Sequence, residues 1–350
     1  MKKLSWFNKF MWILNIVLTV LTVIAYVLPF LAPKLFPILS VLTLFMPLFL
    51  ILNACFFVYW AVLLKKQVIL PALLLLAGIT FINKFYKFSP TELPDSEKDF
   101  TVMSYNVRLF NLFDWIPKDN VGETIEDFIN EKNPDIVCLQ EYSERANVDL
   151  KVYPHKYIMM QGNQVKTGQA IFSKFPIIEE GKLELPNSNN NVVFADIRKG
   201  KDTIRVYSMH LQSVKITPDV DEINNDHINS IDEKKRQVIF RRITDAFKRQ
   251  QQQAEIIQKH RRECKYPVII CGDMNNSAFS YVYRVIKGKL GDCFEEAGKG
   301  FGQTYKFKYY PARIDYIFAD PKLQVKSFEN FSEFENSDHF PVMTRLEMRE

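Results

Sequence analysis

The pattern of apolar and polar positions divides the chain into two parts. Within the first 90 residues, long uncharged runs extend from 10 to 33 and from 35 to 64. Each is long enough to cross a hydrocarbon core of about 30 Å. A third run, from 67 to 83, is at the lower limit for a span. This pattern predicts a transmembrane anchor over residues 1–83, with about three helices.

From residue 99 onward, short apolar runs alternate with amphipathic stretches. Several runs are continuously apolar, as in strands covered on both faces. The predicted strands are 101–106, 135–141, 192–197, 203–210, 267–273, 313–319 and 341–348. Amphipathic patterns predict helices at 120–132 and from about 232 to 262. The alternation favours a layered α/β or α+β domain over 99–350, joined to the anchor by a linker at 84–98.

The net charge of +5 is unevenly distributed between these parts. Residues 1–90 contain eight lysines and no acidic residue, whereas 91–350 hold 37 basic and 40 acidic residues, a net charge of −3. The larger part therefore lacks the overall basic field that is typical of a nucleic-acid-binding domain. The apolar runs contain no ionisable residue that would indicate an ion or proton path, so an anchor is a simpler interpretation than a transporter.

The lysines suggest an orientation in the membrane. Lys2, Lys3 and Lys9 precede the first run and Lys65 and Lys66 follow the second, whereas Lys34 alone separates those two runs. Positive residues favour the cytoplasmic side. We therefore predict a multi-pass protein of the cell membrane whose larger domain is extracytoplasmic. If the third run does not span, that domain is cytoplasmic.

Polar side chains that suit catalysis gather where the predicted strands end. A carboxylate or imidazole that closes a buried strand is costly unless it is paired or binds a cation. The set comprises four carboxylates, two imidazoles and two carboxamides: Glu141, Asp273, Asp315, Asp338, His210, His339, Asn106 and Asn275. Hard oxygen ligands of this kind select Mg²⁺ or Mn²⁺. No CxxC pair or HExxH motif indicates zinc.

The motifs that contain these residues resemble those of the endonuclease/exonuclease/phosphatase superfamily, which includes deoxyribonuclease I-like and neutral sphingomyelinase-like proteins. In chain order they are SYNVRLFN, DIVCLQE, GQAIFSKFPI, VYSMHLQS, VIICGDMNN, RIDYIFAD and SDHFPV. The resemblance covers roughly residues 99–350. It implies a four-layer sandwich of two packed mixed β-sheets flanked by helices, here preceded by an all-α transmembrane region.

The resemblance also implies roles for individual residues. Glu141 is expected to be the main Mg²⁺ ligand, with Asn106 and Asp338 beside it. Asp273 would deprotonate the attacking water, and Asn275 would hold the phosphate. His339 and Arg108 would contact the phosphate, and Asp315 would support the charge of His339. His210 would be the second histidine of the site. For Arg108, an ordinary surface ion pair is an equally good interpretation.

Two segments bear on the substrate. Residues 213–233, directly after His210, contain six acids and one lysine, which would repel a long polyanion. Residues 304–312 interleave aromatic and basic side chains, as expected either of a packed surface loop or of a lip that binds substrate. We therefore expect short phosphoesters or a lipid headgroup to be preferred over duplex DNA.

Together these observations predict a membrane-anchored, Mg²⁺-dependent phosphohydrolase that cleaves phosphodiester bonds by in-line attack of an activated water. The alternatives within this class are a lipid phosphoesterase, like the sphingomyelinases, and a DNA or RNA endonuclease. A membrane protein that uses the fold only for binding is a further alternative, against which the complete motif set argues. The substrate is thus a lipid headgroup, a small phosphodiester or a nucleic acid. No protein partner is indicated.

Overall fold

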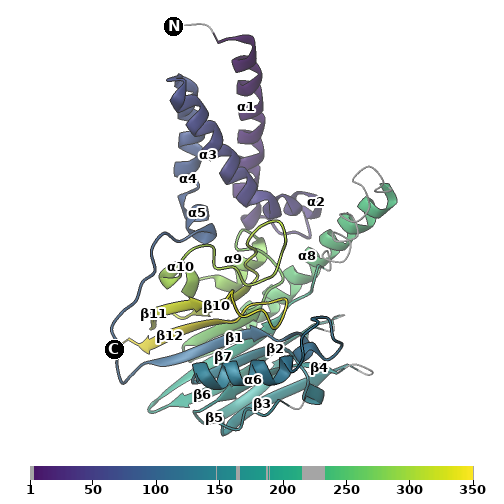
Figure 1. The fold of residues 1–350 in the computed structure, drawn as a ribbon, viewed down its shortest axis with the longest axis vertical. Coiled ribbons are helices and arrows are strands. Elements are labelled where there is room, and N and C mark those ends of the chain that lie inside the picture. The colour runs from purple at the N-terminus through teal and green to yellow at the C-terminus, as the bar shows by residue number, and fades with distance from the viewer. Residues whose placement is uncertain are drawn as a thin grey trace.

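The structure is a computed structural model that describes residues 4–146, 148–162, 166–186, 188, 190–214 and 233–349 (Figure 1). Most of the acidic segment predicted to border the site, residues 215–232, lies outside the described residues. In Figure 1 the N-terminal helices stand above a layered domain that contains the C-terminus.

The layered domain contains two mixed sheets of six strands each. The first has the order β11-β12-β1-β2-β4-β3 and the second β5-β6-β7-β8-β10-β9. Within each sheet one neighbouring pair is parallel, β1 with β2 and β7 with β8. The strands are β1 (Phe100–Asn106), β2 (Ile136–Tyr142), β3 (His155–Gln161), β4 (Thr167–Ser173), β5 (Ile177–Leu183), β6 (Asn191–Lys199), β7 (Asp202–His210), β8 (Val268–Asp273), β9 (Gly291–Asp292), β10 (Asp315–Ala319), β11 (Leu323–Asn330) and β12 (Val342–Met348).

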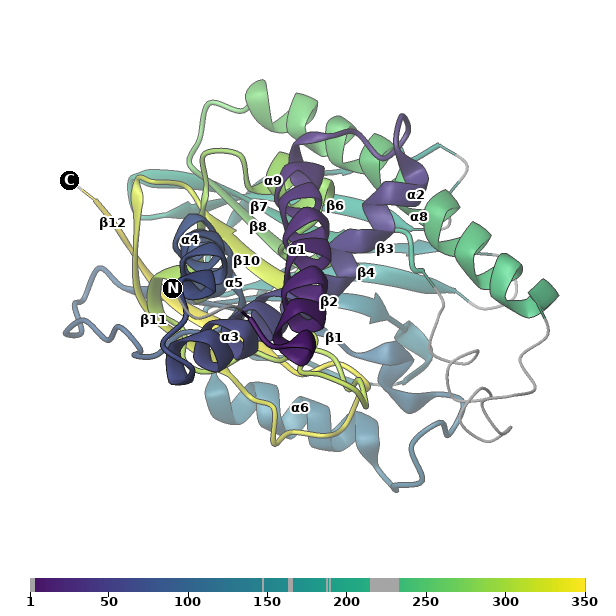
Figure 2. The same cartoon turned by 90° about the horizontal axis from the view of Figure 1, so that it is seen from above.

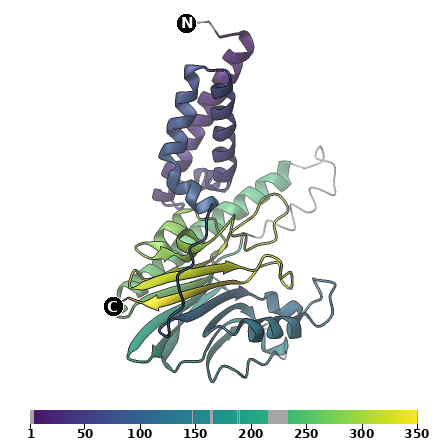
Figure 3. The same ribbon diagram turned by 60° about the vertical axis from the view of Figure 1, so that its left-hand side comes forward.

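Helices cover the outer faces of both sheets and complete the four layers. Between the sheets, Val102 and Cys138 of one pack with Val206 and Cys271 of the other. The outer face of the first sheet is covered by α6 (Val121–Lys132), and that of the second by α8 (Glu233–Arg262) and α9 (Tyr281–Lys287). A short helix, α10 (Cys293–Ala297), packs at β10 and β11. The predicted fold is therefore confirmed, and Figure 3 shows the stacked sheets.

The N-terminal region is helical throughout most of its length. Its elements are α1 (Trp6–Val27), α2 (Pro37–Ser40), α3 (Met46–Val62), α4 (Ile69–Ala77) and α5 (Ile79–Phe85), with short 3₁₀ turns at Leu28–Phe30, Val41–Phe45 and Lys66–Val68. Two helical segments, Trp6–Phe30 and Pro37–Val62, are long and apolar enough to cross a membrane. They correspond to the first two predicted runs and suggest membrane association.

The third predicted run forms a bent pair of helices rather than one straight helix. The segments Lys66–Ala77 and Ile79–Phe85 meet at an angle of 64°. The bend lies at Gly78, where a β-carbon would overlap the phenol oxygen of Tyr26. That hydroxyl instead donates to the carbonyl oxygen of Leu74 at 3.1 Å. A side chain at position 78 would therefore have to displace the hydroxyl of Tyr26.

The helical region packs directly on the layered domain. Phe279, in the loop before α9, is buried with Ala25 and Met46 of the N-terminal helices. Arg284 of α9 donates from Nε to the carbonyl oxygen of Pro29 at 2.7 Å. Figure 2, seen from above, shows the N-terminal helices over α9 and the second sheet. The two regions thus form one packed body.

Candidate active site

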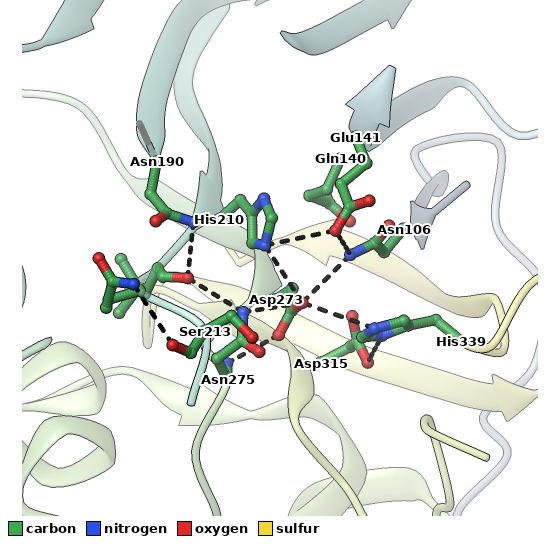
Figure 4. A network of polar contacts seen from close by, with 12 residues as sticks. Asn106, Gln140, Glu141, Asn190, His210, Ser213, Asp273, Asn275, Asp315 and His339 are labelled. Carbon is green, nitrogen blue, oxygen red and sulfur yellow. Dashed lines mark hydrogen bonds and ion pairs between the residues drawn. The ribbon is translucent and has the colours of Figure 1, made fainter. Parts of the chain in front are cut away.

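Several strand ends meet at one edge of the two sheets. The parallel pairs end together, which places Asn106 beside Gln140 and His210 beside Asp273. Strand β10 runs antiparallel to β8, so its first residue, Asp315, also lies opposite Asp273. Figure 4 shows these side chains converging on Asp273. The topology therefore brings residues together from strands far apart in the sequence.

Glu141 lies where the regular pairing of β2 is interrupted. The register with β4 shifts between Gln140 and Tyr142, and Glu141 has a φ of 50°. Residues other than glycine rarely adopt this conformation, and it is concentrated at functional sites. Asn106 donates from Nδ2 to Oε1 of Glu141 at 3.3 Å. The Glu141 side chain is 29% exposed, so it remains accessible to a ligand.

Asn106 is itself held in a defined orientation. Its Oδ1 accepts a hydrogen bond from the backbone N–H of Arg108 at 3.1 Å. As a result Nδ2 faces both Glu141 and Asp273, with a distance of 3.1 Å to Oδ2 of Asp273. Asn106 therefore links the two carboxylates that the sequence analysis placed in different roles.

Asp273 is buried at the centre of the cluster. Its carboxylate accepts hydrogen bonds from N and Nδ2 of Asn275, at 2.7 and 3.1 Å. Nε2 of His210 and Nε2 of His339 each lie 3.7 Å from its Oδ2. Burial raises the pKa of Asp273 to about 6; Asp315 adds to the rise and the two imidazoles oppose it. A carboxylate with this pKa can accept a proton near neutral pH.

His339 and Asp315 form a buried pair. Nδ1 of His339 lies 2.9 Å from Oδ2 of Asp315. Burial by itself lowers the pKa of His339, but the carboxylates of Asp315 and Asp273 outweigh it and raise the pKa to about 10. The imidazole is therefore positively charged at neutral pH. Its Nε2 takes no part in the bond to Asp315 and can donate to an anion.

Arg108 and Asp338 form an ion pair at the edge of the cluster. The distance from NH1 to Oδ2 is 3.4 Å, and both side chains are partly exposed. Arg108 begins a turn in which four successive residues, Arg108 to Asn111, have positive φ. The burial of Leu109 and Phe110 stabilises this unusual backbone. The turn directs the guanidinium toward Asp338 and the ring of Trp115, 4.7 Å from the ring centre.

The structure thus brings together all the predicted site residues. It also reveals three contributors that the sequence analysis did not identify. Ser337 donates to the carbonyl oxygen of Asn106 at 2.8 Å and accepts from N of His339 at 3.2 Å. Gln250 of α8 donates to the carbonyl oxygen of Asn275 at 3.0 Å. Trp115, which the guanidinium of Arg108 contacts, is the third. Of the three, only Ser337 had a signal in the sequence, because it directly precedes Asp338.

The rim of the site is partly described. Within residues 304–312, the ring of Tyr305 lies 4.9 Å from that of His339. Lys306 pairs with Glu335 at 2.8 Å, so its charge is shared with a neighbouring acid. A surface pocket of about 500 Å³ adjoins the Arg108 turn, but it contains none of the predicted site residues. The arrangement of side chains, rather than this pocket, therefore defines the candidate site.

Comparison with known sequences identifies the family of the layered domain. Residues 103–339 match the model of the Endonuclease/Exonuclease/phosphatase family. The match spans more than half of the chain and every predicted site residue, and the protein belongs to this family. Residues 8–85 match a model described as a domain of unknown function, DUF8431. No curated protein matches the chain.

Solved structures of similar fold come from several organisms. D. rerio TDP2 complexed with single-strand DNA product is 17% identical, with a TM-score of 0.53, over 72% of this chain and 100% of that chain. The human nocturnin catalytic domain with bound sulfate is 16% identical, with a TM-score of 0.52, over 73% and 96%. The mannosyl-6-phosphatase of Bacteroides thetaiotaomicron is 21% identical, with a TM-score of 0.50, over 71% and 99%. At these identities the likeness shows the shared fold.

Proposed function

We propose that the protein is a membrane-anchored, divalent-metal-dependent phosphohydrolase that cleaves phosphodiester bonds. One observation carries the proposal: Asp273 is buried between two imidazoles and two carboxamides, with a pKa of about 6. This arrangement supports a general base surrounded by donors to an anion. The apolar helices α1 and α3 support attachment to a membrane.

The donor set fits a hard divalent cation. Four carboxylates, Glu141, Asp273, Asp315 and Asp338, share the site with one arginine and two histidines, so negative groups are in excess. We assign the ion, Mg²⁺ or Mn²⁺, to Glu141, Asp338 and Oδ1 of Asn106. Binding would require the Asn106 amide to turn, because Nδ2 now donates to Glu141 and Asp273. When bound, the ion would neutralise charge on the phosphoryl oxygens.

A second group of side chains could also hold a metal. Ligand atoms of Asp273, Asp315 and His339 lie within 4.8 Å of one another. However, Nδ1 of His339 and Oδ2 of Asp315 already bond to each other at 2.9 Å. We therefore assign this group to proton transfer and phosphate contact rather than to metal binding.

The roles of the chain's own residues follow from their contacts. Ionised Asp273 would orient a water molecule and take its proton as oxygen attacks phosphorus in line with the leaving group. Asn275 and His339 would donate to the phosphoryl oxygens as negative charge develops on them. Asp315 would keep the His339 ring charged and oriented. His210, on the other side of Asp273, would donate a hydrogen bond to the phosphate. Arg108 would contact a phosphate at the rim.

A lipid phosphodiester is the second candidate substrate, and the docking of the helical region favours it. Contacts such as Arg284 with Pro29 and Lys34 N with Gln251 Oε1, at 2.8 Å, hold the domain against the foot of the apolar helices. The site therefore lies close to a membrane surface if those helices span. The nucleic-acid and sugar-phosphate compounds named for the similar structures are further substrates to test.

A substrate panel on the full chain in nanodiscs tests this proposal. Bis(p-nitrophenyl) phosphate, a phospholipid, single-stranded DNA and plasmid DNA would each be supplied with Mg²⁺, with Mn²⁺, or with EDTA. We expect hydrolysis of at least one diester with the metals, loss of activity in EDTA, and recovery on adding excess Mg²⁺. Hydrolysis that persists in EDTA, or no hydrolysis of any phosphoester, would contradict the proposal.

A further inference from the structure

Helix α8 has two halves with different surroundings. Its C-terminal half packs on the second sheet, where Ala254 and Ile257 are fully buried. Its N-terminal half contacts the helical region instead, because Ile243 and Phe247 pack against Val41. In Figures 1 and 3 this half rises away from the sheets toward the level of α2, at the foot of the apolar helices.

Residues 237–249, which we name the α8 arm, expose apolar and basic side chains together. Val238 is 48% exposed and Phe240 is 39% exposed, while the side chain of Arg241 is 86% exposed. The arm contains four basic residues and one acidic residue. Phe240 lies three residues before Ile243 and seven before Phe247, so it continues the face that packs on Val41, whereas Val238 lies on the opposite side of the helix with Arg241. Beyond the contact with Val41, the apolar face of the arm is left exposed at Phe240.

The arm lies beside other exposed apolar residues. The turn that joins α1 to α3 exposes Leu35 and Ile38, at 72% and 64%, and its helix α2 packs against α8. This turn follows directly on an apolar helix long enough to cross a membrane. Viewed from the side of the N-terminal helices, α2 lies against the arm, and the N-terminal end of α8 extends beyond it (Figure 2). That end is therefore open to the side on which a bilayer would lie.

We propose that the α8 arm lies on the bilayer surface and binds anionic lipid headgroups. Its basic residues would contact the phosphates, and Phe240 would enter the interfacial layer, as in other amphipathic interfacial helices. The inference rests on the part of the proposed function that places α1 and α3 in a membrane, and it is independent of hydrolysis.

Internal partners compete with lipid for the charges of the arm. Arg241 lies 3.8 Å from Asp245 within the arm, and Arg242 and Arg249 also interact within the chain. An anionic bilayer presents many phosphates at once and adds an apolar layer for Phe240. The combination favours lipid over these exposed single pairs, which are weak in water.

Lipid binding by the arm would also fix the position of the candidate site. Gln250, the residue directly after the arm, donates to the carbonyl oxygens of Gln212 at 2.7 Å and Asn275 at 3.0 Å. These are residues of the loops that follow His210 and Asp273. The arm would therefore hold the site next to the headgroup layer, where a lipid phosphodiester is supplied at high local concentration.

Spin labels on the full chain test this inference. A nitroxide would be attached at Phe240→Cys, in a Cys55→Ser, Cys264→Ser background that leaves only the buried Cys138, Cys271 and Cys293. Collision rates with oxygen and with a water-soluble nickel complex would be measured in nanodiscs of phosphatidylcholine, with and without phosphatidylglycerol. We expect a several-fold higher ratio of oxygen to nickel collisions in the anionic nanodiscs, and loss of this difference when Arg241→Glu and Lys248→Glu are added.

Two control positions separate the possible failures. Glu131→Cys lies on an exposed part of α6 and should remain accessible to nickel in both lipids. Val58→Cys, at an exposed position of α3, should be accessible mainly to oxygen if α3 spans. Nickel access at 58 would overturn the membrane anchor itself. If position 58 is accessible to oxygen, two results at position 240 would overturn only the lipid-binding arm. In the first, the label at 240 is as accessible to nickel as the label at 131; in the second, it is accessible to neither reagent.

Discussion

Glu141 combines a strained backbone with a partly exposed carboxylate. Its φ of 50° and its contact with Asn106 at 3.3 Å place Oε1 at the edge of the cluster. Replacing it by Gln keeps the shape but removes the charge that would attract a cation. We expect Glu141→Gln to lower metal-dependent turnover by more than the ~10–100-fold typical of losing an outer contact to a metal ligand. Titration with Mg²⁺ would check this; wild-type turnover at saturating Mg²⁺ would exclude the assignment.

Asp273 and His339 are expected to act on the chemical step. Removing a general base typically costs about 10²–10⁴-fold in rate, and we expect Asp273→Asn and His339→Ala each to lower kcat by orders of magnitude.

The stability of Asp273→Asn provides the control. Burial raises the pKa of Asp273 to about 6, so in the metal-free protein the ionised form disfavours folding at neutral pH. The neutral variant should therefore melt no earlier than wild type, whereas a lower melting temperature would indicate a structural role.

Individual residues of the site could be predicted where chemistry interrupts an apolar strand. Asp273 closes β8 and Asp315 begins β10, and each stands out because a charged group is expensive among buried residues. The contribution of Gln250 could not be predicted, since a glutamine on a long amphipathic helix is unremarkable in sequence. Its importance arises only because α8 crosses the loops after β7 and β8.

At the scale of elements, a buried ion pair joins the loop before β10 to the end of β9. Arg313 donates from NH1 to Oδ2 of Asp292 at 2.7 Å, and both side chains are almost fully buried. Arg313 also contacts the carbonyl oxygen of Lys84 at the end of α5. We expect Arg313→Met to destabilise the protein by about 3–5 kcal/mol, because Asp292 keeps an uncompensated charge. Thermal unfolding of the full chain would measure the loss.

An exposed pair of similar length is the matched control for this prediction. Lys306 and Glu335 lie 2.8 Å apart, with side chains 58% and 49% exposed. We expect Lys306→Met to change the stability by no more than about 1 kcal/mol. Equal effects of the two substitutions would show that burial does not determine the contribution of the Arg313 pair.

Most strands that escaped prediction lie at sheet edges. The strands predicted from continuous apolar runs are confirmed, because they are covered on both faces. Strands β3, β5, β9 and β11 were not predicted, and each lies at the edge of a sheet. Strand β4 was not predicted either, although it lies inside its sheet and is almost fully buried. The bend in the third apolar run also escaped prediction. It lies at Gly78, beside Tyr26 of α1, which is about 50 residues away in sequence.

At the scale of the whole molecule, the direction in which each apolar helix runs determines which lysines lie near the layered domain. In Figures 1 and 3, α1 runs from the far end of the helical region toward the layered domain, α3 returns, and α4 and α5 run toward the domain again. The N-terminus and the turn at Lys65 and Lys66 therefore lie at the far end. The sequence predicted the number of runs, whereas their packing against Phe279 and Arg284 required the structure.

This arrangement leads to a prediction of membrane orientation. Lys9, Lys65 and Lys66 lie at the far end, whereas Lys34, Lys84 and Lys87 lie near the domain. In the sequence, Lys2 and Lys3 precede α1. Since the end with more positive charge favours the cytoplasm, we expect the layered domain to be extracytoplasmic, with α4 and α5 crossing as one bent span. The Glu131→Cys variant in the cysteine-depleted background should then react with an impermeant maleimide in sealed right-side-out vesicles. Reaction only after the vesicles are opened would place the domain in the cytoplasm and show that the bent pair does not cross.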